Sequence, residues 1–339
     1  MVRIAWSVAL MMIVIVFFTT SLEAITLEEV EQRGELNCGV STGQPGFSNP
    51  DGEGKWSGLN VDICRAVAAA VLGDAGRVKF IPLIENNQMT ALQSGEVDLL
   101  SMNITWTMTG DTSLGLDFAG IAFYDGQGLL ARKKLNITSA LELGGTAVCL
   151  QEGSAGASNL QVYFKEHNIA YKVIATEDSA QSIKEISTGR CDVMVGKRSE
   201  LYVLLKEIER PDDFMILPEV ISREPVGPIV RQGDDAWFNI VRWTLFAMIN
   251  AEAYGVSSAA IETMKLSSDP NVQNLLGLEG IKGKGLGLAD DWAYQVIRQV
   301  GNYGEVFERN IGVGSALKMD RGLNGLWNRG GILYAPPMR

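Results

Sequence analysis

Side chains that commonly carry out catalysis are sparse in this sequence. Histidine occurs once, as His167 in the polar segment 165–168, and we expect it to lie on the surface. One histidine gives little support to a Ser/His/Asp or Cys/His arrangement. The glycine-rich segment 280–285 lacks the preceding strand and the spacing of a phosphate loop. The paired carboxylates fit helix caps and solvated turns better than general acid and base catalysis; they are Asp212 with Asp213, Asp234 with Asp235, and Asp290 with Asp291. We therefore expect no enzyme, no cofactor and no metal site.

Two loops that follow predicted strands carry groups able to bind a small polar ligand. The loop 101–111 follows the predicted strand 97–100 and is rich in short hydrogen-bonding side chains, among them Asn103 and Thr105. After the predicted strand 147–150, Gly153 and Ser154 open a helix whose free N–H groups can hold a carboxylate. Because α/β folds place ligands beyond the carboxyl ends of their strands, these matching positions predict one binding site.

The elements that must position these loops alternate between strand and helix patterns, which predicts an α/β fold with largely parallel sheets. A first lobe is predicted from strands at 36–40, 78–82 and 97–100. Two helices are predicted in it, one that begins near Asn60, which we expect to be its N-cap, and one at 88–94. A second lobe repeats this order with strands at 147–150, 171–174 and 191–195 and helices ending at Tyr163 and spanning 179–188. A long amphipathic helix is predicted at 237–254. The tail 277–339, with helix patterns at 291–299 and 305–310, is expected to pack on the first lobe.

Two extended segments, 126–132 and 224–231, are expected to form a hinge between the lobes. Two crossings leave a cleft between the lobes, where small ligands bind and which closes by hinge bending. The predicted division is a leader at 1–24, the first lobe at 25–130, the second lobe at 131–226, and a return to the first lobe with a C-terminal extension at 227–339.

The N-terminal residues resemble an export signal. Arg3 supplies a positive charge, an apolar run spans 8–18, and the small residue Ala24 precedes a polar, acidic helix start. The run is short for a membrane span, so cleavage near Ala24 and a periplasmic location are expected, with a retained anchor as the alternative. Because no cysteine lies at the expected cleavage point, a lipid anchor is not expected.

The four cysteines suit this exported location, because an even number in an exported chain indicates disulfides. No CxxC or HxxxH pattern supports zinc or redox use. We predict that Cys38 pairs with Cys64 and Cys149 with Cys191, each pair within one lobe, while the other two connectivities stay open.

Composition narrows the class of partner. The 339 residues are 46% hydrophobic and 20% charged, which is typical of globular domains. A net charge of -11 argues against nucleic acid, which needs a basic surface. A small polar ligand is the expected partner.

Several short motifs together resemble the periplasmic polar-amino-acid solute-binding proteins of ABC transporters, and most closely their general L-amino-acid-binding group. The motifs lie at 38–40, 46–47, 56–58, 61–64, 91–98, 105–107, 111–116, 124–128, 189–192, 291–294, 299–305 and 334–337. The resemblance implies a two-lobed type II periplasmic-binding-protein fold with a two-crossing hinge. It also implies a monomer that delivers an amino acid or related carboxylate to an inner-membrane ABC permease.

The resemblance also implies where the ligand is held, and this sequence departs from the family there. Met102 and Gly110 stand where the family carries arginine for the α-carboxylate, and Lys197 stands where it carries aspartate for the ammonium. Met89 replaces an aromatic residue that stacks on the ligand. The expected ligand-binding residues are Phe47, Met89, Asn103, Thr105, Gly110, Gly153, Ser154 and Lys197.

These departures change the expected ligand. Loss of an arginine fork in a buried site costs about 2–5 kcal/mol, and Lys197 would repel an ammonium. Zwitterionic amino acids are therefore expected to bind poorly, and a keto acid, hydroxy acid or dicarboxylate held by Lys197 is the hypothesis. Alternatively, Lys197 faces solvent and Arg198 or Arg132 enters the cleft. A sensory binder or a dehydratase-like enzyme on the same fold is the alternative to transport.

Overall fold

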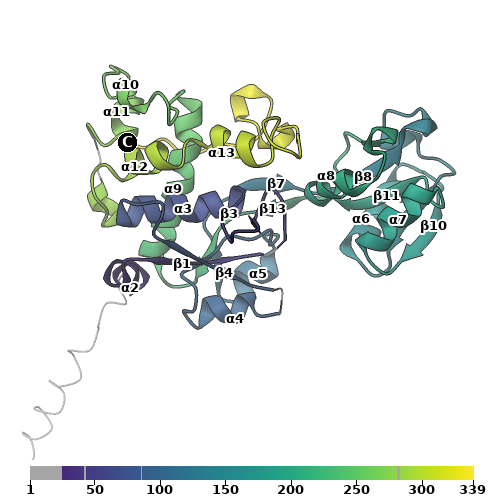
Figure 1. Ribbon diagram of the computed structural model, residues 1–339, viewed down its shortest axis with the longest axis horizontal. Coiled ribbons are helices and arrows are strands. Elements are labelled where there is room, and N and C mark those ends of the chain that lie inside the picture. The colour runs from purple at the N-terminus through teal and green to yellow at the C-terminus, as the bar shows by residue number, and fades with distance from the viewer. Residues whose placement is uncertain (1–24, 42, 85, 281–282) are drawn as a thin grey trace, which may run out of the picture.

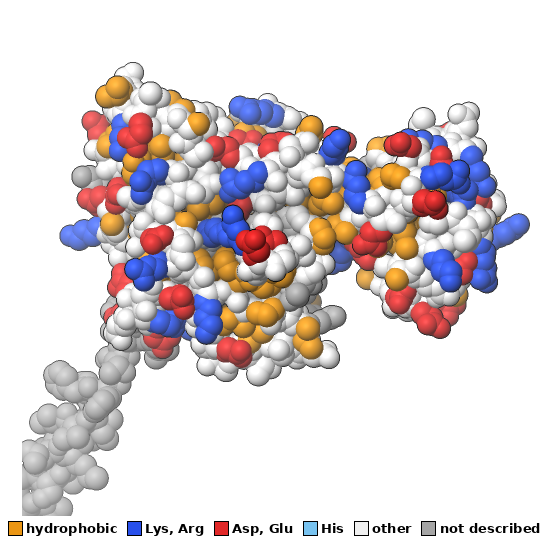
Figure 2. All heavy atoms as spheres, in the orientation of Figure 1, with side chains coloured by type: hydrophobic (Ala, Val, Ile, Leu, Met, Phe, Trp, Pro, Cys, Tyr) orange, Lys and Arg blue, Asp and Glu red, His pale blue; other side chains and the backbone are white. Residues whose placement is uncertain are grey.

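Two α/β lobes joined by a narrow bridge make up the protein (Figure 1). The computed structural model describes residues 25–41, 43–84, 86–280 and 283–339, so the expected leader at 1–24 lies outside the described residues. Within that part of the chain no helix has the length and apolarity to cross a membrane. On the face shown in Figure 2, acidic and basic side chains are interspersed over both lobes, and the bridge forms a narrow neck.

The first lobe contains a five-stranded mixed sheet, in which one strand, β14, runs antiparallel to the other four. Its order is β4 (Val78–Pro82), β1 (Leu36–Val40), β5 (Leu99–Leu100), β14 (Ile229–Arg231) and β6 (Leu116–Phe118). β1 pairs in parallel with β4 and β5, whereas β14 runs antiparallel to β5 and β6. The predicted strands 36–40 and 78–82 are confirmed with the same bounds.

The second lobe repeats this plan, as the sequence predicted. Its sheet has the order β10 (Lys172–Thr176), β9 (Ala147–Gln151), β11 (Val193–Lys197), β8 (Gln127–Arg132) and β12 (Phe214–Ile216). The first three strands are parallel, and β8 and β12 complete the sheet in antiparallel fashion. The mixed α/β architecture with two sheet-containing lobes is therefore confirmed.

The bridge is a two-stranded antiparallel ladder formed by β7 (Phe123–Asp125) and β13 (Glu224–Val226). The outgoing crossing lies earlier than the expected segment 126–132, because β8 is a buried strand inside the second sheet. The returning segment 224–231 divides into β13 in the bridge and β14 in the first sheet. Each crossing is thus only a few residues long.

Helices cover both sheets. Those of the first lobe are α2 (Ile25–Arg33), α3 (Leu59–Leu72), α4 (Gln88–Gln93), α5 (Met108–Ser113), α9 (Asp235–Ala253), α10 (Ile261–Met264), α11 (Pro270–Leu275), α12 (Trp292–Gln299) and α13 (Tyr303–Asn310). Those of the second lobe are α6 (Ala155–Glu166), α7 (Ser179–Thr188) and α8 (Arg198–Glu207). A short ladder joins β2 (Asn49–Pro50) to β3 (Trp56–Ser57). Short 3₁₀ turns span Lys133–Leu135, Ala140–Glu142, Pro211–Asp213, Gly283–Leu286, Gly322–Asn324 and Trp327–Arg329.

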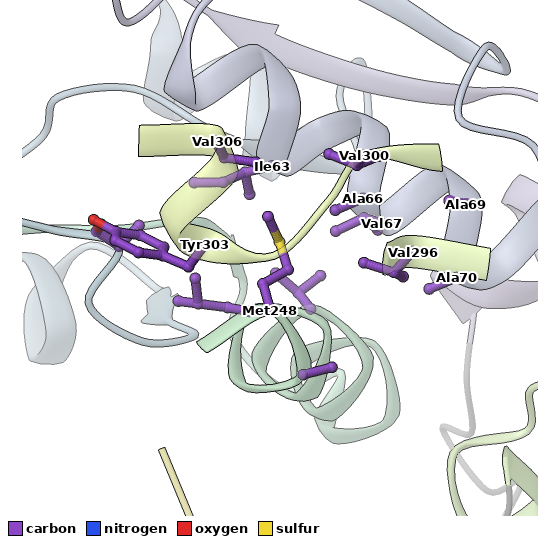
Figure 3. Packing of buried hydrophobic residues seen from close by; sticks show 14 of the residues in the cluster. Ile63, Ala66, Val67, Ala69, Ala70, Met248, Val296, Val300, Tyr303 and Val306 are labelled. Atoms are coloured by element: carbon purple, nitrogen blue, oxygen red, sulfur yellow. The ribbon is translucent and has the colours of Figure 1, made fainter. Parts of the chain in front are cut away.

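The tail packs on the first lobe, as expected. Figure 3 shows the small residues Ala66, Ala69 and Ala70 of α3 facing Val296 and Val300 at α12, with α9 below them. Small side chains on α3 let the two helices approach closely, so the apolar surfaces of α3, α9, α12 and α13 form one core.

The start of α3 corrects one expectation. Asn60 does not cap this helix; the N-cap is Gly58, with φ 133°, and Asn60 lies in the first turn. A Cβ at Gly58 would lie 2.1 Å from the carbonyl oxygen of Phe47, so only glycine fits at this close approach. The buried Asn60 side chain instead donates to Asn103 Oδ1 at 3.0 Å.

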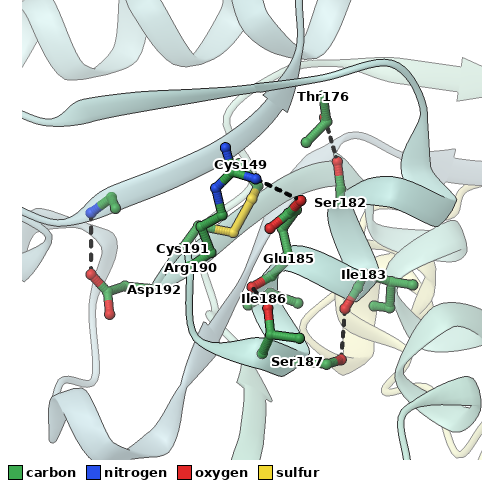
Figure 4. The surroundings of a disulfide bond; sticks show 12 residues. Cys149, Thr176, Ser182, Ile183, Glu185, Ile186, Ser187, Arg190, Cys191 and Asp192 are labelled. Atoms are coloured by element: carbon green, nitrogen blue, oxygen red, sulfur yellow. Dashed lines mark hydrogen bonds and ion pairs between the residues drawn. A yellow bond between two sulfur atoms is a disulfide. The ribbon is translucent and has the colours of Figure 1, made fainter.

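Both predicted disulfides are confirmed. Cys38 of β1 is bonded to Cys64 of α3, and Cys149 of β9 is bonded to Cys191, which precedes β11. Figure 4 shows the second bond close to the ion pair of Glu185 with Arg190 (Nη1 to Oε1, 3.0 Å). Each disulfide joins two segments of the same lobe, so neither of them constrains the bridge.

Candidate functional site

A cleft lies where the carboxyl ends of the parallel strands meet the bridge. Its main cavity, of about 500 Å³, is lined by the segments that directly follow β1, β4 and β5 and by Lys197, the last residue of β11. The lining residues are Ser41, Gln44, Leu83, Ile84, Gln88, Met102, Asn103, Ile104, Thr105 and Lys197. Both lobes thus contribute, at the position that the strand order predicts for a ligand.

An adjoining cavity of about 440 Å³ extends the cleft along α8. It shares Gln44, Asn103 and Lys197 with the main cavity, so the two are parts of one cleft. Its wall from the second lobe includes Glu200 and Glu207 of α8. The cleft is therefore neutral to acidic along this extension.

The loop after β5 is fixed between the first sheet and the bridge. Thr105 forms a β-bridge with Val226, and the Trp106 N–H donates to the Pro225 carbonyl at 2.8 Å. Within the loop, Asn103 Oδ1 accepts from Asn60 Nδ2 at 3.0 Å. Asn103 and Thr105 both line the main cavity, so the polar loop faces the cleft as its composition suggested.

The positions that depart from the family pattern have different surroundings. Met102 lines the cavity but is 4% exposed and belongs to the core beneath the loop. Gly110 is buried in the first turn of α5, where an added Cβ would lie 3.4 Å from the Phe118 ring. Met89 packs against the same small core, and its neighbour Gln88 lines the cavity instead. Of the four departing positions, Met102 and Lys197 line the main cavity, whereas Met89 and Gly110 do not.

Phe47 connects the cleft to the bridge. It is 2% exposed, lines the adjoining cavity, and meets the Phe123 ring edge-on with centroids 5.2 Å apart. The loop that carries it rests on the tail, because a Cβ on Gly46 would lie 2.7 Å from Ile311 and Leu317 side chains. The C-terminal extension thus supports one wall of the cleft.

Gly153 and Ser154 lie apart from both cavities. Ser154 caps α6, since its Oγ accepts from the Ala157 N–H at 3.1 Å and donates to the Gln151 carbonyl at 2.7 Å. Gly153 is exposed in the left-handed region, with φ 74°. The structure therefore does not bring the second predicted loop together with the first in this arrangement of the lobes.

Lys197 is paired rather than free. Its Nζ lies 3.3 Å from Oε2 of Glu224, the first residue of β13. The arginines that were alternatives for the cleft bind elsewhere: Arg198 donates to the Leu217 carbonyl at 2.8 Å, and Arg132 donates to the Ile186 carbonyl at 2.7 Å. Neither arginine lines the main cavity.

Asp125 of β7 lies directly opposite Glu224 in the bridge. Burial raises the pKa of Asp125, whereas hydrogen bonds from the Ser199 hydroxyl and from the N–H groups of Gly126 and Ser199 act in the opposite direction, as does the Lys197 ammonium. Ser199 lies in the first turn of α8, so through these bonds the bridge contacts the N-terminus of a helix of the second lobe.

The chemistry of the cleft is that of a polar receptor. Amide, hydroxyl and ammonium groups line it, while His167 is exposed on α6's C-cap with Nδ1 2.8 Å from the Tyr163 carbonyl oxygen. Among the described residues no cluster of histidine, cysteine or carboxylates is arranged to hold a metal. Sequence reasoning missed Ser41, Gln44 and Gln88, although Ser41 directly follows a predicted strand and Gln88 begins a predicted helix.

Two lobes, two crossings and a polar cleft at the strand ends define a two-lobed solute-binding protein. The chain belongs to the bacterial extracellular solute-binding proteins, family 3, which it matches over residues 36–258. The tail therefore lies beyond the part shared with the family as a whole.

Longer relatives share the tail as well. The general L-amino acid-binding periplasmic protein AapJ of Rhizobium johnstonii is 51% identical over 318 residues, 93% of each chain. The glutamate/glutamine/aspartate/asparagine-binding protein BztA of Rhodobacter capsulatus is 45% identical over 317 residues, 93% of this chain and 94% of that one. An ABC transporter periplasmic binding protein from Brucella ovis, solved with glutathione bound, is 49% identical with a TM-score of 0.81, covering 94% of this chain and all (100%) of that one.

Proposed function

We propose that this chain is the periplasmic solute-binding component of an ABC importer for amino acids or related small polar carboxylates. The observation that carries the proposal is the cleft between the lobes, with hydroxyl and amide groups from the first lobe and an ammonium from the second. The family and the names of the relatives support it, since each is a binding protein rather than an enzyme. An inner-membrane permease is the partner that this role requires.

The lobes act as a clamp. We assign residues 25–122 and 227–339 to one rigid body and 127–222 to the other, with the β7 and β13 ladder as the hinge. Closure brings the N-terminus of α6, with Gly153 and Ser154, towards Asn103 and Thr105. The helix N-terminus then offers N–H groups to a ligand carboxylate, which compensates for the missing arginines.

The ligand class follows from the charges of the cleft. The relatives' names indicate ligands that carry both an ammonium and a carboxylate. Since Lys197 is paired with Glu224, an incoming ammonium does not meet an unpaired cation. We therefore propose an amino acid or a short peptide such as glutathione, in place of the keto acid or dicarboxylate expected from the sequence.

Isothermal titration calorimetry of the exported protein tests the proposal. The probes are the L-amino acids, their 2-keto acids, dicarboxylates and glutathione, and mass spectrometry of the purified chain checks cleavage near Ala24. We expect at least one amino acid or glutathione to bind at about micromolar Kd or tighter. Tighter binding of keto acids than of the matching amino acids would restore the altered-ligand hypothesis, and no binding at all would refute a transport role.

A further inference from the structure

Glu224 contacts three parts of the molecule through one buried carboxylate. It is 8% exposed. Oε1 accepts from Gln127 Nε2 and Ser222 Oγ, both at 3.0 Å. Oε2 accepts from Thr105 Oγ1 at 3.4 Å and lies 3.3 Å from Lys197 Nζ. The carboxylate therefore joins the ligand loop of the first lobe, the bridge and the second sheet.

Lys197 is the cation shared by the two carboxylates of the bridge. Asp125 and Glu224 are directly opposite one another in the ladder, where like charges repel. Lys197 forms the ion pair with Glu224 and also favours the ionised form of Asp125. Side-chain exposures of 34% for Lys197 and 10% for Glu224 place the pair at the cleft wall, partly shielded from water. Lys197 is thus held at the bridge before a ligand arrives.

The charge of the main cavity depends on this pair. Of the described residues that line the cavity, Lys197 is the only one with a charged side chain. Unpaired, it would make the cavity a receptor for anions. Paired with Glu224, it leaves the cavity neutral while still offering N–H donors.

We propose that Glu224 is a specificity-determining residue of the cleft. By holding Lys197, it keeps the cavity neutral and favours ligands that carry an ammonium beside a carboxylate over plain anions. This role rests on the proposed function of the cleft as the ligand site. Thr105 Oγ1 is placed by the same carboxylate, so charge selection and the geometry of the ligand loop are set together.

A ligand-free measurement tests the pairing. In Glu224→Gln the side chain keeps its size but loses its charge, and Lys197 loses its ion-pair partner. Acylation by N-hydroxysuccinimidyl acetate, followed by peptide mass spectrometry, reports the reactivity of Lys197 relative to the exposed Lys165. A lysine held against a carboxylate is a poorer nucleophile, so we expect a several-fold faster reaction of Lys197 in the variant. Equal rates would show that the pair does not hold Lys197 and would overturn the proposal.

A binding measurement tests the specificity. Calorimetry compares each L-amino acid with the 2-keto acid of the same side chain, in the wild type, in Glu224→Gln, and in the exposed control Glu209→Gln. We expect the preference to shift towards the keto acid by about tenfold in Glu224→Gln alone, and adding Lys197→Met to abolish the shift. Binding with an unchanged preference refutes the role of Glu224 only. Failure of every probe to bind the wild type refutes the proposed function and this role together.

Discussion

At the scale of single residues, Tyr303 shows how burial fixes a protonation state. It lies fully inside the first lobe at the start of α13, and its hydroxyl donates to the Ala122 carbonyl at 2.7 Å, just before β7. Burial raises the pKa of Tyr303 far above its ordinary value. The unfolded chain ionises its tyrosines near pH 10, so folding keeps a proton on Tyr303 that unfolding releases at alkaline pH.

Replacement of Tyr303 by phenylalanine tests this. At neutral pH we expect Tyr303→Phe to lower the free energy of unfolding by about 1 kcal/mol, because one buried hydrogen bond is lost. Above pH 10 the wild type should lose stability more steeply than the variant, by up to about 1.4 kcal/mol per pH unit. Urea unfolding between pH 7 and 11 measures both, with Tyr334→Phe, at a 62% exposed tyrosine, as the control. Parallel pH profiles would contradict the assignment.

At the scale of elements, the alternation of strand and helix patterns predicted both sheets and most of their strands. The outgoing crossing was expected at the extended segment 126–132, but an extended pattern does not separate a crossing from a sheet strand, and most of this segment is β8, where Gly128 packs closely. A Cβ there would lie 2.6 Å from Arg198 Cγ of α8.

The cleft was only partly predictable from the sequence, because some of its contacts join residues that are far apart in the chain. Asn103 and Thr105 follow a strand, but the pairing of Asp125 with Glu224 joins positions far apart in the sequence, and no local pattern reveals it.

Each of the two disulfides should stabilise only the lobe in which it lies. Cys149 and Cys191 enclose a loop with a sequence separation of 42 residues in the second lobe. Chain-entropy arguments assign such a bond about 3–4 kcal/mol. We expect C149A/C191A to lower the unfolding temperature of the second lobe, while C38A/C64A, with a separation of 26, acts on the first. Scanning calorimetry of both variants checks this, and an effect of either pair on the opposite lobe alone would contradict it.

At the scale of the whole molecule, the C-terminal extension joins the first lobe to the bridge. Asn324 imitates a neighbouring strand, since its Oδ1 accepts from the Tyr124 N–H at 2.7 Å and its Nδ2 donates to the Tyr124 carbonyl at 3.1 Å. Arg321 holds the same turn through Glu252 of α9 at 3.0 Å. The extension therefore steadies one crossing of the hinge from the side of the first lobe.

Removal of this support should change closure as well as stability. We expect Asn324→Ala to lower the free energy of unfolding by about 1–2 kcal/mol, because partly buried backbone groups of Tyr124 lose their partners. Small-angle scattering should also show a larger radius of gyration without ligand, since the crossing is less restrained. Asn271→Ala, at an exposed position of α11, is the control. A radius identical to that of the wild type would show that the extension does not restrain the hinge.

The bridge has a further consequence for how such a molecule can be built. The chain leaves the first lobe at Asp125 and re-enters it at Glu224, and these residues are direct partners in one ladder. The second lobe is therefore an inserted domain whose N- and C-terminal ends lie side by side. A tight turn could replace residues 127–222 and leave a continuous hairpin, and a different domain could be spliced at the same point. Gene rearrangement at this point would exchange one lobe and its share of the cleft, while the other lobe keeps its own sheet, disulfide and tail.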